Sequence, residues 1–102
     1  MKATNYRQTI TLIELGLADS IREWRHNNNH IPANYRVDDL LELLPENSSK
    51  RIRYIATKRA WVVDVDVLGK SGCAKCYRGV YHAELVDALY DMIVKLKEEG
   101  VI

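Results

Sequence analysis

The sequence predicts an α+β fold, in which short N-terminal helices precede a three-stranded antiparallel sheet and a C-terminal helix packs on the sheet. Two observations predict this arrangement. Apolar residues recur at helical spacing in the first half of the chain and again at its end, and between these regions they alternate with polar residues, as in a strand with one face exposed to water. With 102 residues, the chain is expected to form one small domain, spanning residues 1–102.

The N-terminal region contains three segments with helical character. From Tyr6 to Leu15, apolar residues spaced three and four apart predict a helix, and Gly16 is suited to the left-handed conformation that ends one. The stretch ADSIREWRH, residues 18–26, could add one or two helical turns. The run VDDLLELL, from Val37 to Leu44, predicts a short helix that ends before Pro45.

Three strands are expected next, at about 51–57, 60–68 and 73–80. In the second strand, Trp61, Val63 and Val65 alternate with Asp64 and Asp66. The apolar set is expected to face the C-terminal helix and both aspartates to face water, so that removing the Asp64 carboxylate would change stability by less than about 0.5 kcal/mol. A glycine in the third strand, at position 79, indicates a bulge or bend.

The C-terminal helix is expected at about 82–98, and its apolar residues form two stripes. The first, from Leu85 to Leu96, suits the sheet. The second consists of Val86, Tyr90 and Val94, which lie beside it. Either the N-terminal helices cover this second stripe, or it binds a protein partner or a second copy of the chain.

The segment CAKCYRGVYH contains Cys73, Cys76 and His82, which could be part of a zinc or redox site. Zinc requires four ligands, and residues three apart on a strand point to opposite faces, about 10 Å apart. A disulfide between the two cysteines requires a much shorter separation. We therefore expect two free thiols, one of them packed in the core, with no metal ion and no cofactor, and keep a small zinc or redox protein as a less favoured alternative.

A basic cluster could contact nucleic acid. Cationic side chains would bind phosphates and a tyrosine could stack on a base, and the candidates are Lys50, Arg51, Arg53, Tyr54, Lys58 and Arg59. The net charge of the chain is only +1, so nucleic acid is an alternative that the sequence does not favour. No combination of residues indicates a catalytic site, and the chain is not expected to be an enzyme.

The sequence shows no export signal and no apolar run long enough to span a bilayer, so a cytoplasmic location without membrane contact is expected. The segments LIELGL (12–17), DDLLELLP (38–45) and HAELVDALYDMIVKLKEEGVI (82–102), with a strand pair containing Trp61, resemble a group of small, uncharacterised proteins encoded by bacteriophages and integrated mobile elements. The resemblance implies a cytosolic accessory protein without assigned catalytic residues. The prediction is therefore a non-enzymatic interaction module that binds a macromolecular partner.

Overall fold

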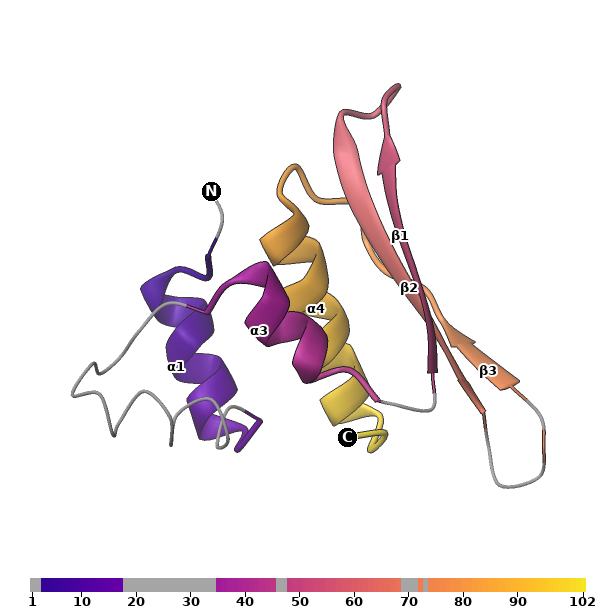
Figure 1. Cartoon of the computed structure of the whole chain (residues 1–102). Helices are drawn as coiled ribbons and strands as arrows, with labels where there is room; N and C mark the ends of the chain where they lie inside the picture. The colour runs from indigo at the N-terminus through magenta and orange to yellow at the C-terminus, as the bar shows by residue number, and fades with distance from the viewer. Residues whose placement is uncertain (1–2, 18–34, 46–47, 69–71, 73) are drawn as a thin grey trace.

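The computed structural model describes residues 3–17, 35–45, 48–68, 72 and 74–102. It confirms the predicted α+β fold, with the C-terminal helix packed on a three-stranded antiparallel sheet (Figure 1). The described elements are, in chain order, α1 (Tyr6–Glu14), α3 (Val37–Glu42), β1 (Ser48–Ile55), β2 (Ala60–Leu68), β3 (Ala74–Tyr77) and α4 (Leu85–Glu98). The helices lie on one side of the sheet, and α4 lies between α3 and the sheet. Among the described residues, no helix combines the length and apolar character needed to cross a bilayer.

Helix α1 begins with a side-chain cap. The side chain of Asn5 accepts a hydrogen bond from the Gln8 backbone N–H (2.9 Å), while the Gln8 side chain accepts one from the Asn5 backbone N–H (3.0 Å). This reciprocal capping box fixes the start of α1. Gly16 follows the helix with a φ of 73°, the left-handed conformation expected of it. The predicted helical segment at 18–26 lies outside the described residues.

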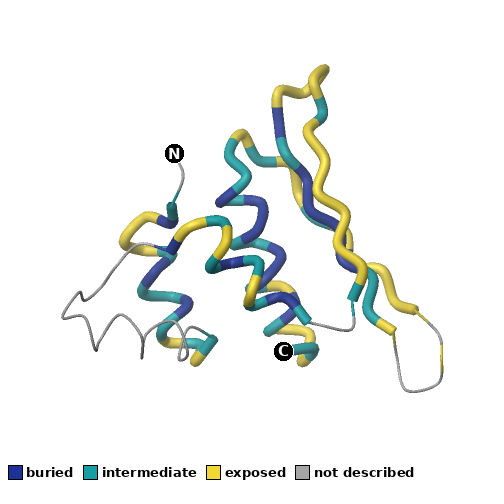
Figure 2. The backbone as a smooth tube through the Cα atoms, viewed as in Figure 1, coloured by how far each residue is buried: buried dark blue, intermediate teal, exposed yellow. Residues whose placement is uncertain are grey.

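The sheet has the order β1, β2, β3, with β2 in the centre. In the antiparallel register, Val63 lies opposite Ile52, and Val65 lies between Lys50 and Tyr77. Paired residues share a face of the sheet, so Val63 and Val65 define the inner face, which α4 covers. Both valines are fully buried in the core, together with α4 residues such as Leu89 and Ile93 (Figure 2).

The third strand is shorter than expected because it ends in a bulge. Between the pairs Val65 to Tyr77 and Trp61 to His82, β2 contributes three residues and the opposite segment four, so one residue is extra. Gly79 lies in this bulge, where an added Cβ would be 2.2 Å from the Val63 carbonyl oxygen. His82 still pairs with Trp61 through two backbone hydrogen bonds, and α4 therefore begins at Leu85 rather than at residue 82.

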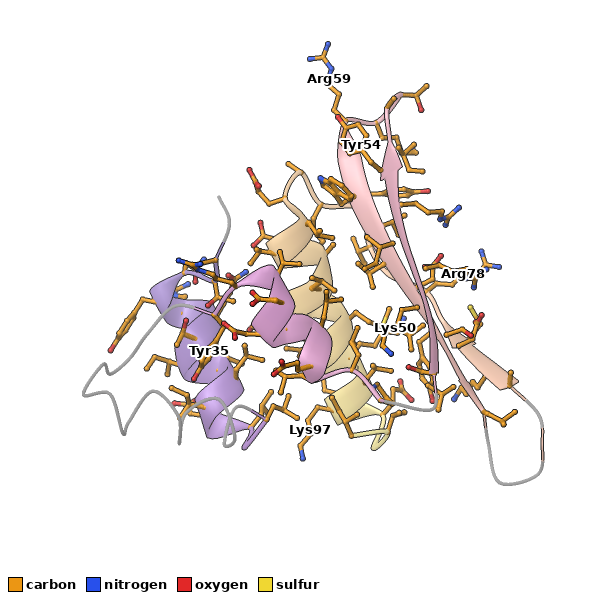
Figure 3. All side chains as sticks on the ribbon, in the orientation of Figure 1. Tyr35, Lys50, Tyr54, Arg59, Arg78 and Lys97 are labelled. Atoms are coloured by element: carbon orange, nitrogen blue, oxygen red, sulfur yellow. The ribbon has the colours of Figure 1, made fainter. Side chains whose placement is uncertain are left out.

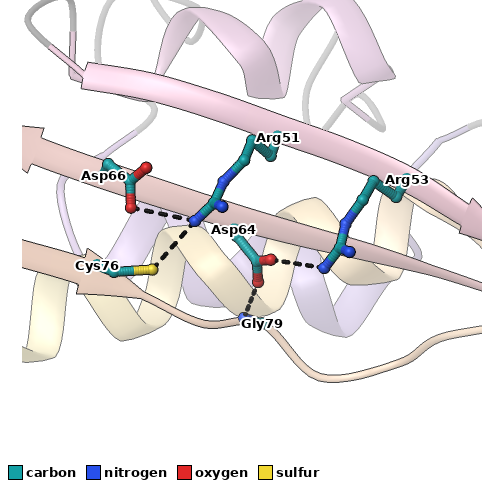
Figure 4. Close-up of polar contacts among 6 residues, drawn as sticks. All are labelled: Arg51, Arg53, Asp64, Asp66, Cys76 and Gly79. Atoms are coloured by element: carbon teal, nitrogen blue, oxygen red, sulfur yellow. Dashed lines mark hydrogen bonds and ion pairs between the residues drawn. The ribbon is translucent and has the colours of Figure 1, made fainter.

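The prediction that Asp64 faces water is wrong. As expected, its side chain lies on the face of the sheet opposite α4, the outer face. The Asp64 side chain is only 8% exposed there, however, whereas that of Asp66 is 31% exposed. One Asp64 carboxylate oxygen accepts the Gly79 backbone N–H at 3.0 Å, and the other pairs with Arg53 at 2.9 Å (Figure 4). Alternation along β2 predicts the face correctly, but it does not reveal that the bulged segment needs an acceptor there.

Candidate interaction surface

Strand β1 is exposed on both faces, although it belongs to the same sheet as the buried β2. From Ser49 to Tyr54 every residue is exposed (Figure 2). Helix α4 packs on β2 and leaves Ile52 and Tyr54 uncovered on the inner face, where they are 37% and 51% exposed. These neighbouring apolar side chains border the edge of the sheet, which is where a partner could cover them.

The outer face of β1 carries two arginines that form diagonal ion pairs with β2. Arg51 pairs with Asp66 (3.2 Å) and Arg53 with Asp64 (2.9 Å), each through its Nη2 atom (Figure 4). The arginine side chains remain 52% and 55% exposed. The Arg51 Nη2 atom also donates to the Cys76 sulfur at 3.2 Å (Figure 4). Each guanidinium has five N–H donors, and the contacts to described residues involve only its Nη2 group, so the other N–H donors are available to further acceptors.

The other members of the basic cluster point elsewhere. Lys50 projects from the inner face toward the helical side and donates to the Pro45 carbonyl at 3.2 Å (Figure 3). Lys58 and Arg59 lie in the turn between β1 and β2, and the Lys58 ammonium sits 4.9 Å from the centre of the Tyr81 ring. The cluster seen in the sequence is therefore divided between two faces and a turn, and two of its cations are paired with carboxylates.

Aromatic residues gather at the turn end of the hairpin. Tyr54 and Trp61 lie opposite each other on the inner face, with ring centroids 5.2 Å apart and planes tilted by 59°. Tyr81 is half-exposed near Lys58, and Arg59 adopts a positive φ of 49° in the turn. Figure 3 shows Arg59 projecting away from the end of the hairpin.

The second stripe of α4 is only partly available to a partner. Val86 is buried in the core that also contains Leu12 and Leu40, so within this structure it is covered by the chain itself. Tyr90 is half-buried and packs against that core. Val94 is also half-buried, and it lines a different feature, a groove of about 450 Å³ between α4 and the segment from Arg78 to Val80.

The groove beside Val94 has mixed chemistry. Val80 supplies exposed apolar surface, while Arg78, Asp91 and Glu98 supply charges of both signs. Two polar contacts hold its walls together: Lys95 donates to the Arg78 carbonyl at 2.9 Å, and the imidazole of His82 pairs with Asp91. His82 thus connects the sheet to α4.

Cys76 lies exposed on the outer face, opposite Asp66. A hydrogen bond with the Asp66 carboxylate raises the pKa of the Cys76 thiol, and the nearby Arg51 and Arg78 oppose this only in part. A thiol with a raised pKa is a weak nucleophile at neutral pH, because little of it is thiolate. Cys73 lies outside the described residues, and among those described no three His, Cys, Asp or Glu side chains are grouped as metal ligands would be.

Ile52 is a surface residue that was not predicted from the sequence. Its signal was present in RIRYI, where Ile52 and Tyr54 alternate with Arg51 and Arg53 and so must share one face. What the sequence lacked was the position of α4, which covers the central strand and leaves the edge strand open.

Comparison of the chain with models of protein families, with curated proteins and with solved structures finds no match.

Proposed function

We propose that the chain is a non-enzymatic interaction module that binds a macromolecular partner through β1. The observation that carries this proposal is a strand exposed on both faces, with Ile52 and Tyr54 uncovered beside the sheet edge. Tyrosine is common among the residues that dominate binding energy at protein interfaces, since it buries a large area and donates a hydrogen bond. The setting in a phage or mobile element, which the sequence resemblance implies, belongs to the same proposal.

The α4 stripe takes a smaller part in this proposal than the sequence suggested. Val86 serves the core, whereas Tyr90 and Val94 retain partly exposed surface that could extend a contact. The nucleic-acid alternative is less favoured because the cationic side chains of the basic cluster are divided between two faces of the hairpin and its turn, so no single face groups them all against a phosphate backbone.

A pair of tyrosine variants tests the proposal. Tyr54→Ser should reduce capture of the partner from a native cytoplasmic extract several-fold, whereas Tyr6→Ser should not, although Tyr6 on α1 is also exposed. Circular dichroism should show that both variants are folded, because neither side chain is buried. Equal capture by the wild type and both variants would remove β1 as the partner site.

A further inference from the structure

The free edge of β1 is long and regular. In the part of the chain that the structure describes, β1 pairs with β2 alone, and its register continues without interruption from Ser48 to Ile55. The second edge of such a strand presents unpaired backbone N–H and C=O groups. An extended segment of another chain can add to these groups as a further strand, with specificity supplied by alternate side chains.

The two faces of β1 offer different chemistry at alternate positions. On the outer face, Arg51 and Arg53 contact the described residues only through their Nη2 groups, which leaves their other N–H donors for a partner. On the inner face, Ile52 and Tyr54 present apolar surface. A strand added at this edge would therefore match β1 best with acidic residues on the outer side and apolar residues on the inner side.

Strand β2 already shows such a match from the other edge of β1. Its aspartates, Asp64 and Asp66, reach diagonally to the two arginines, and Val63 lies directly opposite Ile52. Side chains of β1 stand perpendicular to the sheet, so a strand on the free edge meets the same alternating surface. We infer that β1 binds an extended segment of a partner protein in which acidic and apolar residues alternate, as they do in β2. This inference names the class of partner for the proposed function and rests on it.

A second copy of the chain fits this edge less well. Two β1 strands paired antiparallel about a twofold axis must place residues of the same face opposite each other. In the two such registers that overlap most, Arg51 lies opposite either Arg53 or the Arg51 of the other copy. Like charges directly opposite each other destabilise a strand pair. Nucleic acid also fits less well, because it would satisfy the arginines but leave Ile52 uncovered.

The experiment uses the full-length chain and a labelled nine-residue peptide with the sequence of β2, AWVVDVDVL. The peptide should bind, and it should slow hydrogen exchange of backbone amides in β1, which is the direct signature of an added strand. A peptide with both aspartates replaced by lysine should bind roughly tenfold more weakly, because two favourable cross-strand pairs become unfavourable. A scrambled peptide of the same composition should give no protection of β1.

Two variants of the chain provide the matched control. Arg51→Gln should weaken binding of the β2 peptide and reduce its preference over the lysine peptide, whereas Arg7→Gln, an exposed cation on α1, should change neither. Equal binding of the scrambled peptide, or binding without protection of β1, overturns the inference.

The remaining outcomes separate this inference from the proposed function. If the peptide does not bind but Tyr54→Ser still abolishes capture of a natural partner, the inference fails and the module proposal stands. If both tests are negative, both fail. Protection of β1 by a single-stranded oligonucleotide, with steep salt dependence and without peptide binding, would assign the strand to nucleic acid. A dimer in sedimentation, with β1 amides protected before any peptide is added, would assign it to a second copy.

Discussion

The two edges of the sheet are built in opposite ways. The β3 edge has a strand of four residues, then a bulge at Gly79, and then the isolated pair of Trp61 with His82. Short strands and bulges are devices by which proteins keep sheet edges from pairing with other chains. The β1 edge has eight regularly paired residues, and its charged side chains discourage unwanted pairing. One edge is thus closed by backbone geometry, while the other is restricted by chemistry and remains open to a strand that matches it.

The largest expected effect comes from removing the bulge glycine. Gly79→Ala places a Cβ 2.2 Å from the Val63 carbonyl oxygen, and backbone atoms cannot move aside as a flexible side chain would. Unfolding in urea should show a loss of about 3 kcal/mol. Val80→Ala, at the exposed neighbouring residue, should cost less than about 0.5 kcal/mol. Similar costs for the two variants would mean that the bulge does not hold the β3 edge.

A second pair of variants compares directly opposite residues on the central and edge strands. Val63→Ala should cost about 2 kcal/mol, because it removes buried methyl groups and leaves a cavity under α4. Ile52→Ala removes a larger part of a side chain but should cost less than about 1 kcal/mol, since Ile52 is partly exposed. Thermal denaturation of both variants measures the difference. A larger cost at Ile52 would show that β1 is covered in the folded chain.

Of the two aspartates on the outer face, the buried one should contribute more to stability than the exposed one. Asp64→Ala leaves the Gly79 N–H and Arg53 without their acceptor, and we expect a loss of about 1.5 kcal/mol in the free energy of unfolding. Asp66→Ala removes a more exposed ion pair, which is worth less than about 1 kcal/mol. Equal effects in urea titrations would mean that the bond to the bulge contributes nothing.

The smallest effect concerns reactivity rather than stability. Asp66 raises the pKa of the Cys76 thiol, so less thiolate is present at a given pH. Alkylation of Cys76 by iodoacetamide should therefore be slower than that of an unperturbed model thiol. In a Cys73→Ser background, the rate should therefore rise at a higher pH than for a model thiol. Asp66→Asn should lower that pKa and speed the reaction at pH 8. An unchanged rate profile would show that Asp66 does not act on the thiol.

Local patterns in the sequence were sufficient for the type and order of the described elements and for their faces, but less so for their ends: the strand expected at about 51–57 spans Ser48–Ile55. The alternation in AWVVDVDVL predicted β2 within its observed bounds and placed Val63 and Asp64 on opposite faces. The helical spacing after Leu85 predicted α4 and its buried stripe, and Gly16 predicted the end of α1. These features follow from chain periodicity and backbone preference, which act over a few residues and can be read without knowledge of the fold.

The environment of each face was decided by tertiary structure. Nothing near Asp64 in the sequence indicated that the N–H of Gly79, fifteen residues later, would need its carboxylate. Val86 and Ile52 are both apolar residues on amphipathic elements, yet Val86 is buried and Ile52 is exposed. The sequence by itself determined which residues share a face. The packing of α4 on β2, rather than on β1, decided which faces are covered, because one helix can cover only part of a three-stranded sheet.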